Sequence, residues 1–456
     1  MRRRDVSLLL AALPVAASYI STVLSQSIDL LLLSHYSGDA LAAVFPGFIV
    51  CWNLMMFFVG FAKYIRILMG EEMALRGPYA VGRTVWLGML VALAAGCVFL
   101  ALSRASGPLF RSIAHPPQVR QLEIIYFTIS CYCVPWQIAK VVFEQFYIAV
   151  GRQMTVLWTN AISLAVNTIL AVVLIFGAYG APRLGIAGAA YATLAATAIT
   201  VLAYCVPAGL DPTLRPYSLL SLPRPNWRLL GKFMRKGVPC GVETFVEELT
   251  WTVLILAIGR LGSFALALSN VAVNILELAY LPVVGVGEII SLQIARSSAN
   301  LDSIEARRLA RLALGATLIY GALWSIALAS SSATIRALYF SAPEFQGADS
   351  NQTFSHYFAI LEACTFCGPF YYTCSAILTG KGDTAFSMMA FVLTTVCLFC
   401  FPLYAVIRYD LPFLWGWLFF GVNLATAALI AGVRCSWADR VPTPILQAKP
   451  TGSSGT

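Results

Sequence analysis

Acidic side chains interrupt the long apolar stretches of this chain, where a charge is expensive to bury. In such surroundings a carboxylate must hold a proton, bind a cation or pair with a base. These groups therefore mark positions at which an ion could be loaded and released. They are Asp29 and Glu144 in the first half of the chain, and Glu243, Glu247, Glu248, Glu277, Glu288 and Glu362 in the second half.

Glu243 and Glu247 are spaced to act together, because residues four apart share one face of a helix. Two carboxylates this close in a low dielectric cannot both ionise at low cost, so one holds a proton or both share a cation. We predict ion coupling by H⁺ or Na⁺ at this pair, with Glu247 as the candidate Na⁺ ligand. Asp29 has no partner of opposite charge in its own helix and is predicted to be an ion-coupling residue of the first half. The alternative for Asp29 is a carboxylate near a helix end that reaches water.

Neutral polar and aromatic side chains near these acids are predicted to line a substrate cavity. Asn270 and Asn274 share a helix face, although hydrogen bonding between helices would also explain them. Aromatic rings around Tyr371 could hold a lipophilic cation by cation–π attraction. The predicted lining is Asn167, Asn270, Asn274, Glu277 and Tyr371.

Two further sets of charges have structural interpretations. Lys140 and Glu144 are four residues apart, so we predict a neutralised pair that fixes packing or gating. Glu248 and Glu288 are expected to serve helix packing or hydrogen bonds near helix ends. The cysteines lie almost wholly in apolar stretches and are expected to pack as small apolar residues, so no metal site and no catalytic residue is predicted.

The elements that must position these residues are membrane-spanning helices. The chain is 59% hydrophobic and 11% charged, whereas soluble domains carry about 25% charged residues. Lipid offers a backbone no hydrogen-bond partner, so each span has to be a helix. The predicted spans are 7–33, 41–68, 84–103, 123–150, 155–177, 184–207, 234–259, 265–294, 308–330, 353–379, 385–407 and 412–434. The fold class is thus an all-α integral membrane protein with twelve transmembrane helices in two pseudo-repeated six-helix lobes.

The two halves repeat a set of landmarks. Pro14 and Pro239 lie near the start of equivalent segments, and Pro135 and Pro369 keep a similar offset. Two similar halves can move about a shared central site and open it to either side in turn. The predicted units are an N-terminal lobe (1–208), a Pro-rich cytoplasmic linker (209–233), a C-terminal lobe (234–440) and a disordered cytoplasmic tail (441–456).

The basic residues indicate topology. The net charge is +9, and most Lys and Arg gather at Arg2 to Arg4, in the stretch 215–236 and at other span ends on the same side. The positive-inside rule then places both termini in the cytoplasm of a multi-pass plasma (inner) membrane protein. No nucleic-acid partner is expected. The loop 104–122 departs from this pattern with three arginines outside, so either it is interfacial or the third span is misplaced.

Several blocks in order resemble the MATE family of multidrug and toxic compound extrusion transporters. The blocks are Asp29 with Ser37 to Ala43, Val166 to Gly177, Gly180 to Thr193, Lys236 to Pro239 ahead of Glu247, and Leu378 to Thr384. The resemblance covers about residues 7–435. It implies twelve helices in two lobes around a central cavity, with cytoplasmic substrate exchanged for external H⁺ or Na⁺.

The resemblance also assigns residues. Asp29 falls on the family's first-helix acid and Glu247 on its seventh-helix acid. A second acid in the fifth helix would fall on Ala171, and the tenth-helix acid would fall on Gly368. Glu243, Glu277 or Glu288 is the candidate replacement for these two missing acids.

The main hypothesis is a secondary antiporter that exports organic, cationic or amphipathic compounds as a monomer and needs no cofactor. A flippase for a lipid-linked sugar or lipid is the alternative, but it would need cationic residues in the cavity, and Lys140 is the only basic residue deep in a span. An enzyme is disfavoured because the three histidines are scattered. An ATP-driven pump is disfavoured because no phosphate-binding Gly-rich loop is present.

Overall fold

A computed structural model describes residues 3–111, 116–219, 226–339 and 350–438. The first half of the chain forms helices joined by short turns. In order they are α1 (Arg3–Tyr36), α2 (Gly38–Lys63), α3 (Ile65–Arg76), α4 (Pro78–Arg104), α5 (Ser106–Arg111), α6 (Pro117–Ala149), α7 (Gln153–Phe176), the 3₁₀ turn η1 (Ala178–Gly180), α8 (Ile186–Leu210) and the 3₁₀ turn η2 (Pro212–Tyr217).

The second half is also helical. Its elements are α9 (Trp227–Gly259), α10 (Ser263–Ala299), α11 (Ser303–Tyr339), α12 (Ser350–Gly380), α13 (Thr384–Thr394), the π-helical turn η4 (Thr395–Cys400), α14 (Phe401–Arg408) and α15 (Leu414–Ala438). Since α13, η4 and α14 follow one another without a break, they act as one long helix.

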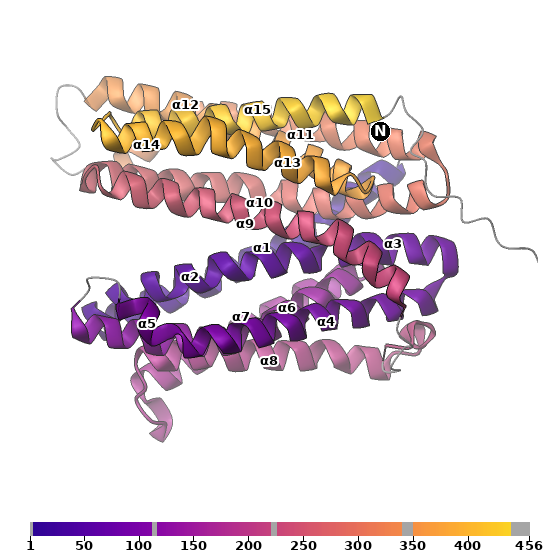
Figure 1. Cartoon of the computed structure of the whole chain (residues 1–456), viewed down its shortest axis with the longest axis horizontal. Helices are drawn as coiled ribbons and strands as arrows, with labels where there is room; N and C mark the ends of the chain where they lie inside the picture. The colour runs from indigo at the N-terminus through magenta and orange to yellow at the C-terminus, as the bar shows by residue number, and fades with distance from the viewer. Residues whose placement is uncertain (1–2, 112–115, 220–225, 340–349, 439–456) are drawn as a thin grey trace, which may run out of the picture.

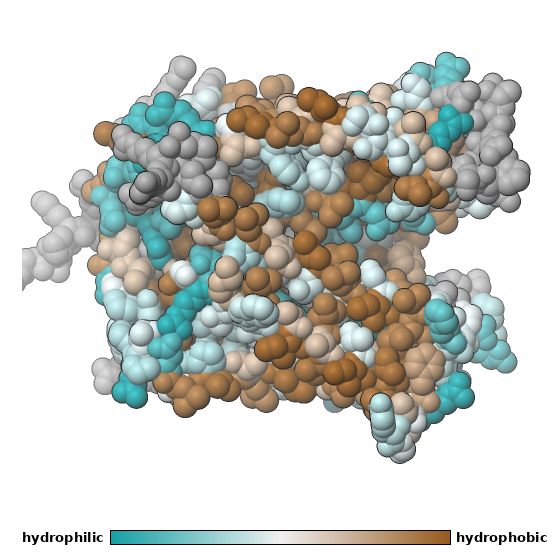
Figure 2. Space-filling view, turned by 180° about the vertical axis from the view of Figure 1, so that it is seen from behind, coloured by the Kyte–Doolittle hydropathy of each residue, from teal (hydrophilic) through white to brown (hydrophobic). Residues whose placement is uncertain are grey.

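Ten of these helical segments are long and apolar enough to cross a membrane, counting α2 with α3 and α13 with α14 as continuous spans. α9 and α12 have a similar length but are not among these ten, and α9 carries Glu243, Glu247 and Glu248 near its middle. The ten segments together with α9 and α12 are the twelve helices that the sequence predicted. Figure 2 shows the matching surface, with a hydrophobic belt between two hydrophilic ends.

The helices form two lobes, which lie one above the other in Figure 1. α1 to α8 make one lobe and α9 to α15 make the other, so the predicted all-α, two-lobed architecture is confirmed. The N-terminal lobe contains a core around Leu33, Ala171 and Ile175. The C-terminal lobe contains a core around Leu254, Tyr357 and Trp417.

The lobes meet where α2 crosses α9. A Cβ at Gly60 would lie 2.7 Å from the Cys240 carbonyl oxygen, and one at Gly241 would lie 2.6 Å from the Phe57 carbonyl oxygen. Only glycine allows the two backbones to approach this closely. The crossing is therefore tight, and a larger side chain there would push the lobes apart.

The contact between lobes is concentrated at one end of the molecule. Gly285 of α10 packs on α1, since a Cβ added there would lie 2.8 Å from the Ala12 carbonyl oxygen. The largest apolar cluster also runs between the lobes, from Ala12 and Ile65 to Leu292 and Ala295 of α10. We call this end, where η2 leads toward α9, the linker end. Figure 2 shows the surface hollowed between the lobes at the other end, away from α3.

Some predicted boundaries differ from the observed ones. The segment 104–122, predicted to lie outside the membrane, contains the short helix α5, and the preceding helix α4 begins at Pro78 instead of residue 84. α9 begins at Trp227, inside the stretch 209–233 that was predicted to be linker. The predicted tail 441–456 lies outside the described residues.

Candidate functional site

Asp29 lies on α1 inside the N-terminal lobe, against α7 and α8. The Thr193 hydroxyl of α8 is 3.3 Å from Asp29 Oδ2, and the Asn167 amide of α7 donates to that hydroxyl at 3.3 Å. Thr193 follows the turn at Gly185, whose positive φ turns the chain into α8. The sequence predicted Asp29 and Asn167 as separate ion and cavity residues, and the structure brings them together.

Two oxygens in this group have no hydrogen-bond partner among the described residues. Asp29 Oδ1 and Asn167 Oδ1 are both buried and unsatisfied. Buried acceptors without donors are costly, and a proton on the carboxyl or a small bound cation would satisfy them. The arrangement can therefore hold H⁺ or Na⁺ with oxygen ligands.

Glu243 lies on α9 inside the C-terminal lobe, where three hydroxyls surround one carboxylate oxygen. Tyr371 and Ser375 of α12 each donate to Glu243 Oε1 at 2.7 Å, and Ser387 of α13 donates at 2.9 Å. The Glu243 residue is 7% exposed and Tyr371 is 2% exposed. The sequence predicted Glu243 as an ion-coupling residue and Tyr371 as a cavity residue, and a direct hydrogen bond between them ties α9 to α12.

Glu247 lies one turn further along α9 and faces a narrow cavity within the C-terminal lobe. Its walls are mostly aromatic, formed by Trp251, Tyr280, Tyr371, Tyr372, Phe391 and Phe420 together with Thr250 and Leu424. The cavity volume is about 10 Å³, roughly enough for one water molecule. Among the described residues, Glu247 forms no hydrogen bond or ion pair, so a proton or a single small ion fits this position better than a bulky ligand.

Glu248 of α9 contacts the other lobe, and Glu277 of α10 is exposed. Glu248 accepts a hydrogen bond from Trp52 of α2 at 3.1 Å, and Glu277 interacts electrostatically with Glu248. Asn270, Asn274 and Glu277 are all exposed and share one side of α10. In the parts of the chain that the structure describes, no hydrogen bond joins these three to the Asp29 or Glu243 groups, and the Asn274 amide donates to the Asn270 carbonyl oxygen of its own helix.

Lys140 and Glu144 of α6 pair as their spacing predicted. Lys140 Nζ is 3.7 Å from Glu144 Oε1, and Asn160 of α7 donates to the same oxygen at 2.9 Å. The two charged side chains are 13% and 15% exposed. The pair fixes α6 against α7 inside the N-terminal lobe.

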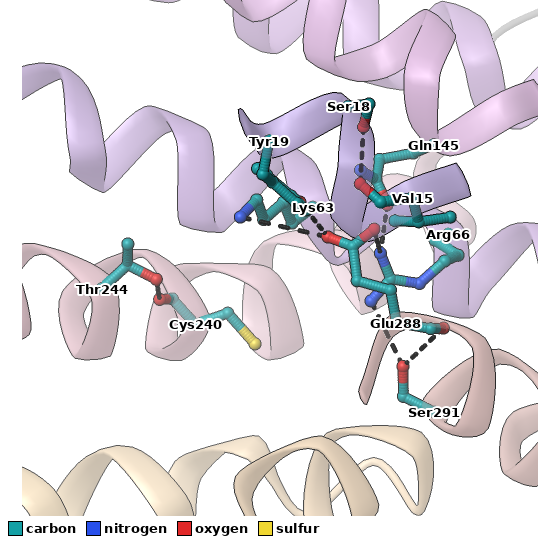
Figure 3. Close-up of polar contacts among 10 residues, drawn as sticks. All are labelled: Val15, Ser18, Tyr19, Lys63, Arg66, Gln145, Cys240, Thr244, Glu288 and Ser291. Carbon is teal, nitrogen blue, oxygen red and sulfur yellow. Dashed lines mark hydrogen bonds and ion pairs between the residues drawn. The ribbon is translucent and has the colours of Figure 1, made fainter. Parts of the chain in front are cut away.

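A charged cluster between the lobes was missed by sequence reasoning and is drawn in Figure 3. Glu288 of α10 is 4% exposed, and Arg66 of α3, 6% exposed, lies 3.3 Å from its Oε2 atom. Lys140 is therefore not the only basic residue deep in the bundle, contrary to the expectation. The signal was present in Lys63 and Arg66, which are three residues apart in the predicted span 41–68, but both looked like topological charges near its end.

The two positions where the resemblance places acids are filled by other groups. Ala171 is fully buried in the core of the N-terminal lobe. At Gly368, a Cβ would lie 2.7 Å from Tyr280 Cε1 and closer still to the end of the ring. The Tyr280 hydroxyl donates to the Cys364 carbonyl oxygen at 3.2 Å, so this tyrosine occupies the room that an acid at 368 would need.

Within the described parts of the chain, no group of three or more His, Cys, Asp or Glu side chains is arranged to hold a metal ion.

Comparison with known proteins gives one consistent result. The family model described as MatE matches residues 14–173 and 239–403. A probable multidrug resistance protein NorM from Rhizobium meliloti is 24% identical over 436 residues, covering 93% of this chain and 92% of the relative. The probable multidrug resistance protein YoeA of Bacillus subtilis is 25% identical over 350 residues, 75% of this chain and 74% of the relative.

Solved structures agree in fold. The crystal structure of a MATE protein in the bent conformation has a TM-score of 0.82 at 16% identity, covering 97% of this chain and 99% of the other. An outward-facing multidrug resistance MATE family transporter of the MOP superfamily has a TM-score of 0.79 at 16% identity and covers 96% of each chain.

Proposed function

This chain belongs to the MATE family, and from that premise we propose that it is a secondary antiporter. It exports organic compounds in exchange for H⁺ or Na⁺ by alternating access. Asp29 in the N-terminal lobe and Glu247 with Glu243 in the C-terminal lobe are the proposed ion-coupling residues. The names of the relatives, multidrug resistance proteins, support export as the direction of transport.

The observation that carries ion coupling is the unsatisfied oxygen pair at Asp29. A carboxylate with a purely structural role is expected to have its acceptor oxygens filled by donors. Asp29 Oδ1 and Asn167 Oδ1 instead stay buried without donors. This is the arrangement expected of a site that binds an ion in one step of a cycle and releases it in another.

The proposed substrates are organic cations or cationic amphipaths. Glu248 contacts Trp52 of the other lobe, Glu277 is exposed, and aromatic rings surround the neighbouring Glu247 inside the C-terminal lobe. Negative charge beside aromatic faces favours a lipophilic cation. Asn270 and Asn274, exposed on the same side of α10 as Glu277, are proposed to line the same cavity.

A flippase for a lipid-linked sugar is not favoured. Its pyrophosphate would need free cationic side chains, and the buried Arg66 is already engaged by Glu288 at 3.3 Å. Lys140 is likewise engaged by Glu144.

The remaining assignments complete the proposal. The protein would act as a monomer in the plasma (inner) membrane, with both termini in the cytoplasm. Its units would be the N-terminal lobe 1–208, the cytoplasmic linker 209–233, the C-terminal lobe 234–440 and the cytoplasmic tail 441–456. The linker end would then be the cytoplasmic end.

The test is efflux of a fluorescent organic cation from proteoliposomes, driven separately by a pH gradient and by a Na⁺ gradient. We expect one gradient to drive efflux, and Asp29→Asn and Glu247→Gln each to reduce it to the rate of protein-free liposomes. The control is Glu305→Gln, because the partner of Glu305 within the described residues is Arg308 of the same helix, α11. Ion-driven efflux that survives both Asp29→Asn and Glu247→Gln would overturn the assignment of these residues to ion coupling. Efflux that proceeds in the absence of both gradients would overturn ion coupling itself.

A further inference from the structure

Glu288 is the centre of a buried polar cluster that joins the two lobes (Figure 3). It comes from α10 of the C-terminal lobe, and its partners come from the N-terminal lobe. Tyr19 of α1 donates to Glu288 Oε1 at 2.5 Å, Arg66 Nη1 lies 3.3 Å from Oε2, and Lys63 Nζ lies 4.0 Å from Oε1. A single carboxylate thus contacts α1, α2 and α3 of the other lobe.

Arg66 of α3 is held in place by side chains from two other helices. Besides Glu288, its guanidinium donates to Gln145 of α6 and to Ser291 of α10, the latter at 3.2 Å. Ser291 and Glu288 are 1% and 4% exposed. The guanidinium is therefore a bridge between α6 and α10, which belong to different lobes.

Close packing surrounds this cluster. A Cβ at Gly70 of α3 would lie 2.8 Å from Leu292 Cδ1 of α10, so the two helices touch there. Arg296, two turns beyond Glu288, donates to the carbonyl oxygen of Ala149 at the end of α6. The charges are consequently sealed from water at the linker end and lie between surfaces that must separate if this end opens.

From these contacts we propose that Glu288 and Arg66 form the latch that holds the lobes together at the linker end. Opening the central space toward that end requires the ion pair and the Tyr19 hydrogen bond to break. Glu288 and Arg66 are thus positioning residues that set the balance between the two access states. The proposal rests on alternating access as proposed above, although its test does not depend on transport.

Lys63 links the latch to the proposed ion site. Its ammonium group lies over the Tyr19 ring at 5.0 Å and is 31% exposed at the side chain. It also attracts Glu247 and Glu248 of α9 electrostatically. Since one cation is shared by the latch and the α9 acids, its removal should weaken the latch less than removal of Arg66, which is nearer to Glu288 and more deeply buried.

The test measures the distance between lobes at the linker end in nanodiscs. Spin labels on noncanonical side chains would replace Tyr79 at the start of α4 and Ile304 at the start of α11, which are 54% and 77% exposed. This choice leaves the 12 native cysteines unchanged. Double electron–electron resonance then gives the populations of the close and separated states for each variant.

We expect Glu288→Gln or Arg66→Gln to raise the separated population by at least about tenfold, a factor that corresponds to about 1.4 kcal/mol. Lys63→Gln should raise it less, and the control Glu305→Gln should not change it. The double variant Arg66→Gln/Glu288→Gln should fall below the sum of the single effects, because neither charge is left buried alone.

Two results would overturn the latch. One is an unchanged distance distribution in both single variants, and the other is a double variant whose effect equals the sum of the singles. If a single variant does not fold, the double variant, which removes one positive and one negative charge, still tests the latch. It must show a larger population of the separated state than wild type. These outcomes are independent of efflux, so a failure of the proposed transport activity would be distinguishable from a failure of the latch.

Discussion

Gly368 provides a direct test of how α10 and α12 pack, since Gly368→Ala adds one methyl group against Tyr280. The added Cβ would lie 2.7 Å from Tyr280 Cε1, which is well inside van der Waals contact. Forcing extra atoms into a packed core costs about 1–3 kcal/mol, and loss of the Tyr280 to Cys364 hydrogen bond costs about 0.5–1.5 kcal/mol. Replacement of glycine by alanine in a helix returns about 1 kcal/mol. The expected net effect is a loss of about 0.5–3.5 kcal/mol in the free energy of unfolding.

Gly368→Ala should also lower transport. Tyr280 forms part of the wall of the Glu247 cavity, so a displaced ring changes the shape of the proposed ion site while Asp29 stays untouched. The matched control is Gly315→Ala in α11, where a Cβ meets nothing within 4 Å. That variant should be neutral or slightly stabilising and should keep full activity.

The assay is unfolding by sodium dodecyl sulfate in mixed micelles, followed by circular dichroism, with Gly368→Ala made in wild type and in a Tyr280→Ala background. Once the ring is removed, the added methyl group has room, so its cost should vanish. The same cost in both backgrounds would refute the reasoning, as would a Gly368→Ala protein as stable and active as Gly315→Ala.

Two further predictions concern charges elsewhere. Glu144→Gln should lower the free energy of unfolding by about 3–5 kcal/mol, because it leaves the buried Lys140 charge unpaired, and Lys140→Met/Glu144→Gln should recover much of this loss in the same unfolding assay; an equal loss in both proteins would contradict the pairing. The backbone amide and the hydroxyl of Thr213, followed by Arg152, hold the pKa of Asp211 below its usual value of 3.8. A carboxylate whose pKa is lower in the folded protein stabilises the fold at pH values above its pKa in the unfolded chain, and this stabilisation is lost as the pH falls through its pKa in the folded protein. Asp211→Asn should therefore speed hydrogen exchange of residues 211–217 at about pH 7 but not at about pH 3. A difference that persists at low pH would contradict this account.

The helices were predictable because a backbone that crosses lipid must form its hydrogen bonds within the segment. Apolar runs located the long helices, ten of which are apolar enough to cross a membrane, and the landmarks Pro14 and Pro239 lie inside α1 and α9. The ends were less accurate, since helices such as α10 continue beyond the apolar region into polar residues. Hydropathy measures where lipid is tolerated and carries no information about how far a helix extends into water.

The polar groups were predictable where a charge interrupted an apolar stretch or lay one helical turn from another charge, as Lys140 and Glu144 do. Asp29 and Glu243 were visible for that reason, and their partners Thr193 and Ser387 were not, because isolated hydroxyls are common in helices. Arg66 was hidden by its place near a span end, where basic residues usually report topology. Its pairing with Glu288 joins residues more than 200 positions apart, and no local spacing encodes such a contact.

α1 is a single helix that packs against the other lobe near one end and against its own lobe near the other end. Near Ala12 it packs on α10 of the other lobe, and at Asp29 it joins α8 of its own lobe. At about 1.5 Å per residue these points are roughly 25 Å apart along one rod. A tilt of about 5° at the Asp29 end would carry the far end sideways by about 2 Å, enough to disturb close packing. A small tilt of α1 caused by ion binding at Asp29 would therefore displace its contact with the opposite lobe.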